Sequence, residues 1–281
     1  MAVIETEPIL AENYRLLQQH VYRRSGIVID HDKHYLFECR LGPIVTRLGL
    51  RSINELCTLL RDGLHSGIDH EVAEAMTTNE TYFFRDPAQY DAIRHVLLPS
   101  LGEQHKDVRR LRFWSAAAST GQEAYSLAIT LLEAGFGAWD IEILATDFSS
   151  QVLERAKSGV YQQIEVNRGL PAPFLVKYFR RSGVTWQVKD EVRRLVRFKE
   201  MDLRQGFQAL GPFNMVFCRN VMIYFDPTTR SELLPKIHSS LLPRGWLYFG
   251  GAEAYSGFDA WFQRQTVGKS TVYVALRKDP S

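Results

Sequence analysis

Hydrophobic residues recur at helical spacing through about the first 70 residues. The stretch "ENYRLLQQHVYRRSG" ends at Gly26, and "SINELCTLLRDG" starts at Ser52, has Glu55 three positions later and ends at Gly63. Serine followed by glutamate three residues on is typical of a helix N-terminus, and glycine is typical of a C-terminus. Together with "KHYLFECRLGPIVTRLGL" and "DHEVAEAMTTNE", these segments predict a small bundle of three or four helices.

From about Leu111 onward, strand-like runs alternate with helical ones. "LRFWSAAA", "IEILATDFS" and "FNMVFCRNVMIYF" are each followed by a helical segment, and "WLYFGGAE" and "STVYVALR" come after them as further strands. This alternation predicts an α/β fold with a parallel sheet and helices on both faces. Ligands of such sheets bind beyond the carboxyl ends of the strands, where Gly121, Asp147, Arg219 and Glu253 fall.

One segment, from Tyr161 to about Lys199, is too long for a simple crossover. "FLVKYFRRSG" has a helical pattern, and "VTWQVKDEVRRLVRFK" resembles short strands with a turn at Lys189-Asp190. We interpret residues 161–199 as an inserted antiparallel β-subdomain. The sequence therefore predicts a helical domain over 1–75 and an α/β domain over 76–281.

Composition narrows the class of protein. The chain has 281 residues, 45% of them hydrophobic, and a formal net charge of +2. The charge gives no general reason to expect a nucleic-acid partner, and "FRRSG" and "VRRLVRF" are too modest to form a basic stripe with aromatic platforms. No stretch reaches the roughly 18 apolar residues of a membrane span. The start "MAVIETEPILAENY" does not resemble a signal peptide, and the three cysteines (Cys39, Cys57 and Cys218) have no C-x-x-C spacing. We expect a soluble, cytoplasmic protein with reduced thiols and no bound metal.

The turn within "SAAASTGQEAYSLA" raises the question of its ligand. It has a single glycine, Gly121, and a carboxylate, Glu123, where a phosphate site favours glycines or a lysine. A nearby acid suits a positively charged ligand, and Asp147 at the end of the next strand suits the hydroxyls of a ribose. S-adenosylmethionine carries an ammonium, a sulfonium and a ribose but no phosphate, so it fits this turn better than NAD or ATP.

Asp147 and Glu123, and four further candidate site residues, also have purely structural interpretations. Asp147 in "DFSSQVLE" is placed to cap a helix, and Thr120 with Glu123 has the spacing of a capping box. Asn79 and Thr81 fit a helix start before "YFF". Arg85 fits a surface ion pair with Asp86, and Tyr224 fits a core position.

Four motifs resemble the CheR family of chemotaxis receptor-glutamate methyltransferases: "MTTNETYFFRD", "FWSAAASTGQEAYSLA", "ATDFSSQVLERAKSGVY" and "FCRNVMIYFD". "YLFECRLGPIVTRLGL" resembles the helical first domain of that family. The resemblance covers nearly the whole chain and implies a Rossmann-like class I methyltransferase domain. It also implies transfer of a methyl group from S-adenosylmethionine to glutamate carboxylates of chemoreceptors. Two departures are Ala124, where the family usually has proline, and Asp202, where it often has asparagine.

The resemblance assigns roles to individual residues. It places Arg85 and the Tyr224 hydroxyl near the transferred methyl group. It implies that the cofactor contacts are Asn79, Thr81, Arg85, Glu123, Asp147, Asp202, Leu203, Arg219 and Asn220. Because the acceptor carboxylate is already ionised at neutral pH, the reaction requires no general base.

Partner interactions are open to two interpretations. Arg40 and Arg47, seven residues apart on one helix face, form either a solvated surface or a docking face for an acidic receptor helix bundle. His31 and His34 are the only two histidines close together in the sequence, and a polar loop accounts for them better than a metal site does. "RRSGVTWQVKDEV" has only one glycine, Gly183, whereas family members that bind a receptor tail peptide carry a longer glycine-rich loop. We therefore expect a monomer that lacks this peptide tether.

Two rival functions remain. One is a methyltransferase for a small carboxylic acid or a nucleic acid, and the other is a non-catalytic regulator that binds the cofactor. The presence of both Arg85 and Tyr224 disfavours the regulator.

Overall fold

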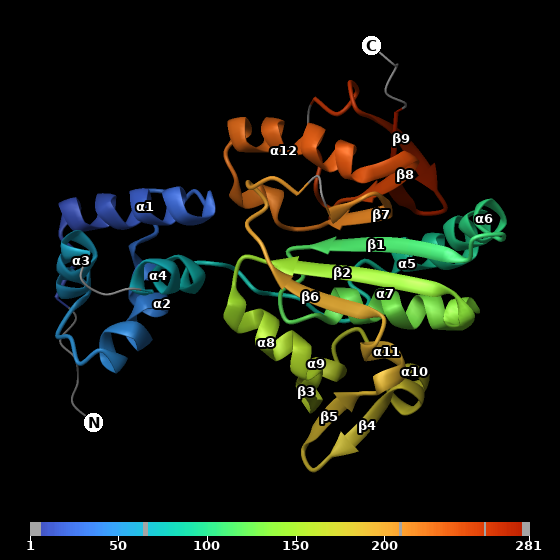
Figure 1. Cartoon of the computed structure of the whole chain (residues 1–281). Coiled ribbons are helices and arrows are strands. Elements are labelled where there is room, and N and C mark those ends of the chain that lie inside the picture. Colours follow the sequence, from blue (N-terminus) through green and yellow to red (C-terminus); the bar gives the residue numbers. More distant parts are fainter. Residues whose placement is uncertain (1–6, 64–66, 208–209, 256, 277–281) are drawn as a thin grey trace. The chain divides into compact units, whose positions relative to one another are not determined.

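The computed structural model describes residues 7–63, 67–207, 210–255 and 257–276 (Figure 1). The chain forms two compact units. One comprises the chain up to Thr78 together with Tyr224–Thr229, and the other comprises Asn79–Ile223 and the chain from Arg230 onward.

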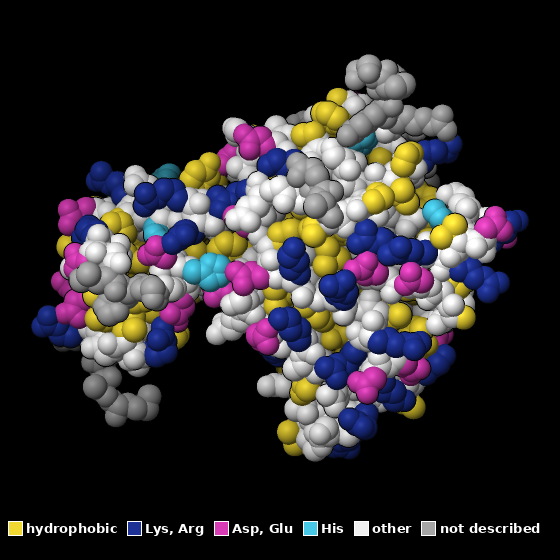
Figure 2. All heavy atoms as spheres, viewed as in Figure 1, with side chains coloured by type: hydrophobic (Ala, Val, Ile, Leu, Met, Phe, Trp, Pro, Cys, Tyr) yellow, Lys and Arg dark blue, Asp and Glu magenta, His cyan; other side chains and the backbone are white. Residues whose placement is uncertain are grey.

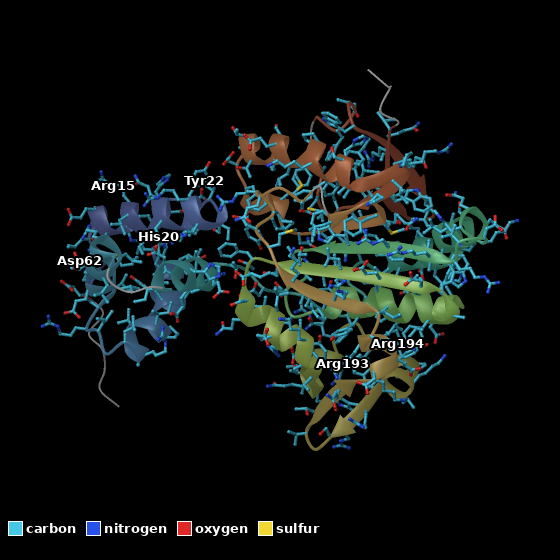
Figure 3. The ribbon with its side chains drawn as sticks, viewed as in Figure 1. Arg15, His20, Tyr22, Asp62, Arg193 and Arg194 are labelled. Atoms are coloured by element: carbon cyan, nitrogen blue, oxygen red, sulfur yellow. The ribbon has the colours of Figure 1, made fainter. Side chains whose placement is uncertain are left out.

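The first unit contains four helices: α1 (Ala11–Ser25), α2 (His34–Arg47), α3 (Ile53–Asp62) and α4 (Ile68–Ala75). Their ends confirm the sequence signals, because Gly26 and Gly63 cap α1 and α3 in the left-handed conformation and the Ser52 hydroxyl accepts a bond from the Glu55 amide. The helices enclose a buried cluster that includes Leu17, Phe37 and Leu56. His20 of α1, labelled in Figure 3, contacts α4, because its Nε2 is 2.8 Å from the Asp69 carbonyl oxygen.

The second unit is built on a seven-stranded sheet with the order β6-β2-β1-β7-β8-β10-β9. The strands from β6 to β8 are parallel to one another, and β10 is antiparallel to both of its neighbours, β8 and β9. The strands are β1 (Arg110–Ala116), β2 (Asp140–Asp147), β6 (Val196–Glu200), β7 (Phe213–Cys218), β8 (Leu241–Tyr248), β9 (Phe262–Val267) and β10 (Ser270–Ala275). The expected Rossmann-like fold is confirmed.

Helices flank this sheet: α5 (Pro87–Ala92), the π-helix η1 (Ile93–Leu97), α6 (Leu98–Gln104), α7 (Gln122–Glu133), α8 (Ser150–Ser158) and α12 (Pro227–Ser240), with short 3-10 turns η2 (Phe136–Ala138) and η4 (Met222–Tyr224). The helices after β1 and β2 lead toward β6, whereas α12 leads from β7 to β8 in the opposite direction. Because such crossovers are right-handed, α7 and α8 cover one face and α12 covers the other (Figure 1). The direction reverses between β1 and β7, which is where ligands bind in open α/β sheets.

The insertion is a separate antiparallel sheet with the order β3-β5-β4, as the sequence predicts. It contains β3 (Val160–Gln162), α9 (Gln163–Val166), α10 (Ala172–Tyr178), β4 (Phe179–Ser182), β5 (Thr185–Val188) and α11 (Asp190–Arg193). Arg193, labelled in Figure 3, joins α11 to the end of α8 by donating to the Lys157 carbonyl at 3.0 Å.

Two local expectations were wrong, and two parts of the fold were missed. The expected turn at Lys189-Asp190 is followed by α11, and "VRFKE" is not part of the insertion but is the edge strand β6, parallel to β2. The polar strand β9 and the helices from Pro87 to Gln104 were missed. A strand with alternating exposed residues has the same pattern in either sheet, so only tertiary pairing decides to which sheet it belongs.

Figure 2 shows Lys and Arg side chains spread over the face that carries β6 and the insertion. Exposed members include Arg180, Arg181, Arg197 and Lys199. Within the described ranges, no helix has both the length and the apolar composition that a membrane crossing requires.

Candidate functional site

The turn between β1 and α7 has an irregular backbone. Ala117, Ser119 and Gly121 have φ angles of 63°, 51° and 92°. A Cβ on Gly121 would lie 3.0 Å from Ala156 Cβ and 3.2 Å from the Tyr161 hydroxyl. The glycine therefore allows close packing of this turn against α8 and β3, a requirement that the sequence pattern did not reveal.

Asp147, at the end of β2, is 6% exposed and braces this turn. Its Oδ2 accepts a bond from the Ser119 amide at 2.8 Å, and its Oδ1 accepts one from the Ser149 amide at 3.0 Å. Helix α8 is capped by the Ser149 side chain, so the alternative interpretation of Asp147 as the N-cap does not hold. The Ser119 hydroxyl donates to the Asn79 carbonyl at 2.8 Å, so Ser119 joins the start of the second unit to Asp147.

Glu123, Arg219 and Asp86 form an ion cluster at the reversal point of the sheet. Arg219 Nη1 lies 2.8 Å from Glu123 Oε2, and its Nη2 lies 2.6 Å from Asp86 Oδ2. The other Glu123 oxygen accepts a bond from the Ser115 hydroxyl at 2.6 Å. The cluster holds two carboxylates for one guanidinium, so its formal charge is negative. Gly121 is the N-cap of α7 and makes no side-chain cap bond, so the capping box of Thr120 and Glu123, the structural alternative, does not form.

Burial and charge have opposite effects on the pKa values of Arg219 and Asp86 in this cluster. Burial alone would lower the pKa of Arg219, whose side chain is 2% exposed, but Glu123, Tyr90 and Asp86 together outweigh burial and raise the pKa. Burial alone would raise the pKa of Asp86, but the Gly251 amide and Arg219 together lower it. Arg219 Nε is buried and has no hydrogen-bond partner among the described residues. A buried donor without a partner is uncommon and favours a ligand acceptor at this point.

Arg85 lies in a short segment with a constrained backbone. Phe84 and Asp86, on either side of it, have positive φ angles of 53° and 62°. The Arg85 carbonyl accepts a bond from Arg219 Nη2 at 2.7 Å, and its own Nη1 donates to the Glu80 carbonyl at 3.3 Å. Asp86 pairs with Arg219 and not with Arg85, so the alternative interpretation of Arg85 and Asp86 as a surface ion pair does not hold.

Asp202 follows β6 and forms a tight pair with Arg204. Its Oδ2 lies 2.6 Å from Arg204 Nη2, and its Oδ1 accepts a bond from the Arg204 amide at 2.9 Å. The neighbouring Leu203 is 8% exposed. The Met201 amide donates to the Asp147 carbonyl at 2.8 Å, which places this loop beside the end of β2.

Asn220 follows β7 and has a φ of 57°. Its amide donates to Glu253 Oε2 at 2.7 Å, and the Gly250 amide donates to the same oxygen at 2.5 Å. The Tyr255 hydroxyl bonds to Glu253 Oε1. Glu253 therefore ties the loop after β7 to the loop after β8.

The remaining candidates occupy different settings. Asn79 and Thr81 lie in an irregular stretch before α5, which begins at Pro87, so the alternative interpretation of a helix start at these residues does not hold. Tyr224 is partly exposed and belongs to the first compact unit, where its carbonyl accepts a bond from the Val28 amide at 2.9 Å. His34 stacks on Tyr14 with ring centroids 3.7 Å apart.

Two family models match nearly the whole chain. Residues 12–77 match the CheR methyltransferase all-alpha domain, and residues 79–271 match the CheR methyltransferase SAM-binding domain. The chain belongs to the CheR methyltransferase family. It is a protein-glutamate O-methyltransferase that uses S-adenosylmethionine (SAM) and methylates chemoreceptor glutamates.

Curated relatives cover almost the same length. Chemotaxis protein methyltransferase 1 of Pseudomonas aeruginosa is 35% identical over 274 residues, which span 94% of this chain and 97% of the relative. The chemotaxis protein methyltransferase of Escherichia coli is 36% identical over 276 residues, which span 95% of this chain and 91% of the relative.

Sequence reasoning missed several residues that shape the site of this CheR protein. Ser115, Ser119, Asp86 and Arg204 all bind predicted cofactor residues or their backbone. The spacing of polar residues gave no signal for them, because the positive φ angles and the pairing of distant loops that bring them together are tertiary features.

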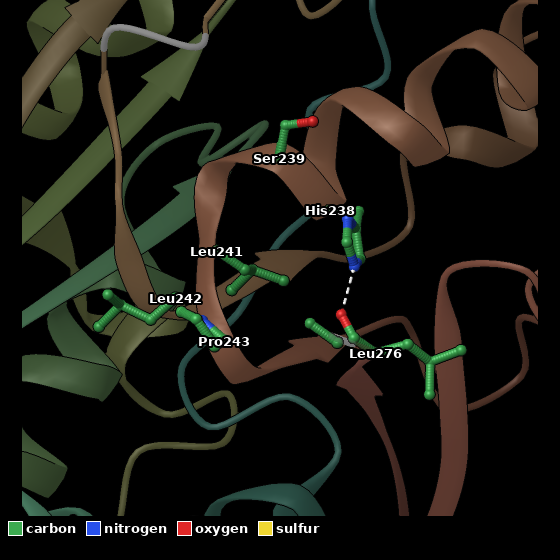
Figure 4. Close-up of a pocket in the computed structure, with 7 residues that line it drawn as sticks. His238, Ser239, Leu241, Leu242, Pro243 and Leu276 are labelled. Atoms are coloured by element: carbon green, nitrogen blue, oxygen red, sulfur yellow. Dashed lines mark hydrogen bonds between the residues drawn. The ribbon is translucent and has the colours of Figure 1, made fainter. Parts of the chain in front are cut away.

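A separate cavity of about 420 Å³ lies between the end of α12, the start of β8 and the end of β10 (Figure 4). His238 Nε2 lies 2.9 Å from the Leu276 carbonyl there. Because this is the amino end of β8, the cavity lies at the opposite edge of the sheet from the ion cluster.

Proposed function

We propose that the residues at the carboxyl edge of the sheet hold SAM, and that the chemistry of each residue determines which part of the cofactor it contacts. The Asp147 carboxylate accepts hydrogen bonds from the ribose hydroxyls, because an ionised carboxylate offers about four acceptor positions. The fixed backbone bonds to Ser119 and Ser149 support this role, since they orient both oxygens before the ligand arrives. Asp202 and Leu203 contact the adenine side.

The ion cluster holds the methionine end of the cofactor. The unpartnered Arg219 Nε is the observation that carries this assignment, because it points to a missing acceptor such as the methionine carboxylate. The excess negative charge of Glu123 and Asp86 favours the cofactor's ammonium and sulfonium. Asn79, Thr81 and Asn220 complete the contacts.

When bound, SAM supplies the sulfonium methyl group that the acceptor oxygen takes up. Arg85 and Tyr224 orient the acceptor carboxylate. No residue needs to remove a proton, because neutral pH lies well above the usual glutamate pKa of about 4.3 and the carboxylate is already ionised. The main contribution of the protein is alignment of the reacting groups. Arg85 suits this role because its backbone is held by Arg219 while its side chain makes only peripheral contacts, to the Glu80 carbonyl and the Tyr82 ring.

The partner is the acidic helix bundle of a chemoreceptor, and the enzyme acts as a cytoplasmic monomer. In α2, Arg47 suits a docking face, because it is exposed and pairs only with Glu71 among the described residues. Arg40 suits it less, because its guanidinium binds the carbonyls of Met76 and Thr77 at 2.6 and 3.0 Å.

We also propose that no receptor tail peptide tethers this enzyme. The β4–β5 turn has only two residues, Gly183 and Val184, since Ser182 pairs with Thr185. A short turn leaves few backbone groups to pair with an added peptide strand. Tail pentapeptides from tethered receptors are expected to show no micromolar binding in calorimetry, and such binding would reject this part of the proposal.

The decisive test uses labelled SAM with receptor cytoplasmic fragments. We expect label on the receptor that base releases, as methyl esters require, and we expect loss of label when the acceptor glutamates are changed to alanine. Label that resists base, or label on nucleic acid or small carboxylic acids instead, would favour a rival function.

A further inference from the structure

A cavity of about 450 Å³ lies next to the Arg85 segment in the second unit. Its walls are the start of α5 from Asp86 to Gln89, the loop from Phe249 to Ala254 after β8, and the β9–β10 hairpin. The aromatic rings of Phe249 and Tyr273 lie 5.2 Å apart in this lining. This volume is within the range of small-ligand pockets.

The acidic groups of this cavity are already bound. Asp86 Oδ2 accepts bonds from Arg219 at 2.6 Å and from the Gly251 amide at 3.0 Å. Glu253 Oε2 accepts bonds from the Asn220 and Gly250 amides. A Cβ on Gly251 would lie 3.2 Å from Asp86 Cγ, so this wall is packed closely. The two carboxylates are structural links of the wall.

The basic side chains that line this cavity, unlike its carboxylates, have no such partners among the described residues. Arg264 on β9 and Lys269 in the hairpin turn line the same cavity and are exposed. Neither side chain forms a hydrogen bond or an ion pair with another described residue. The charge that remains available to a ligand is therefore positive.

The cavity also adjoins Arg85, which the proposed function places beside the acceptor carboxylate. Asp86, which forms one wall, directly follows Arg85, and Arg219 binds both the Asp86 carboxylate and the Arg85 carbonyl. A polypeptide whose glutamate reaches Arg85 thus has neighbouring residues within reach of this wall.

We propose that this cavity binds a second carboxylate of the substrate, an acidic side chain close in sequence to the acceptor glutamate, through Arg264 and Lys269. The inference rests on the proposed function of Arg85. It makes the enzyme selective for acidic segments.

The test uses receptor fragments with one acceptor glutamate and a neighbouring position that is either glutamate or glutamine. Exposed ion pairs contribute about 0.2–1 kcal/mol each, so two of them predict a roughly 2- to 30-fold higher kcat/KM for the glutamate fragment. The double variant Arg264→Gln, Lys269→Gln is expected to lose this preference while keeping its affinity for S-adenosylhomocysteine. Fragment affinity, measured by calorimetry with S-adenosylhomocysteine bound, is expected to change in the same way.

Matched controls separate this effect from net charge. Arg109 and Arg244 are exposed and lie outside the cavity lining, so Arg109→Gln, Arg244→Gln is expected to keep the preference. Equal kcat/KM and equal affinity of the wild type for both fragments would overturn the inference, as would a preference retained by the cavity variant. A wild type that labels neither fragment rejects the proposed function itself. The comparison of the wild-type kcat/KM for the two fragments still tests the inference if the cavity variant does not fold.

Discussion

Arg219 Nη2 lies 2.6 Å from Asp86 Oδ2, in a pair whose guanidinium is 2% exposed and whose carboxylate is 33% exposed. The same nitrogen donates to the Arg85 carbonyl at 2.7 Å. One guanidinium therefore fixes two adjacent residues, and its other arm reaches Glu123. This arrangement couples the segment before α5 to the loop after β7 and to the first turn of α7.

Replacing Asp86 by alanine is expected to slow methyl transfer and lower stability. The change removes the charged acceptor of the exposed Gly251 amide and of the buried Arg219 Nη2, which keeps only its bond to the Arg85 carbonyl. Hydrogen bonds to charged groups contribute about 1.5–3 kcal/mol to the unfolding free energy. Urea unfolding and steady-state kinetics measure the two effects. Asp91→Ala, an exposed position on α5, is the control and should behave as wild type. Unchanged stability and kcat in Asp86→Ala would contradict the coupling.

The lowered pKa of Asp86 predicts a pH dependence of stability. A carboxyl whose pKa is lower in the folded state stabilises it above the unfolded pKa, and this contribution is lost as pH falls through the folded pKa. Between about pH 5 and 2, the unfolding free energy of the wild type should fall more than that of Asp86→Asn. Parallel curves for the two proteins in urea unfolding would show that Asp86 makes no such contribution.

Asp147→Ala is expected to weaken binding of S-adenosylhomocysteine about 10- to 100-fold, because hydrogen bonds to a charged group contribute about 1.5–3 kcal/mol. Some loss of stability should accompany it, since Asp147 also accepts the Ser119 and Ser149 amides. Calorimetry measures the affinity. Asp140→Ala, at the opposite end of β2, is the control. Wild-type affinity in Asp147→Ala would remove this residue from the cofactor site.

Arg85→Ala is expected to lose most methyl transfer while unfolding at nearly the wild-type temperature. Its side chain contacts only the Glu80 carbonyl at 3.3 Å and the Tyr82 ring at 5.5 Å among the described residues, so little stability depends on it. Turnover on receptor fragments and thermal unfolding measure the two effects. Retained activity together with a large fall in melting temperature would make Arg85 a structural residue.

Arg47→Glu is expected to impair receptor methylation at low salt and to spare cofactor binding. The defect should shrink as salt rises, because surface charges are screened within about 10 Å at 0.1 M salt. Arg40→Glu should in addition lower stability, since Arg40 holds the carbonyls after α4. Wild-type rates of Arg47→Glu at low salt would show that this face is only solvated.

The sequence by itself determined the elements that depend on local pattern. The helical bundle followed from apolar spacing and from caps such as Ser52 and Gly26, and the α/β domain followed from alternating strands and helices. The motifs identified the family and its cofactor. Period and capping are properties of short segments, so they can be read without knowing the fold.

Tertiary structure decided how these elements meet. The pattern of "VRFKE" fits either sheet, and only pairing with β2 makes it the edge strand β6. Glu123 had the spacing of a capping box, but the arrival of Arg219 from a strand far along the chain makes it an ion-pair partner. Adjacency in sequence left an ion pair of Asp86 with Arg85 open, but Asp86 binds Arg219 in a segment where Phe84 and Asp86 have positive φ angles. Contacts between residues about 100 positions apart depend on strand order, and no local pattern encodes that order.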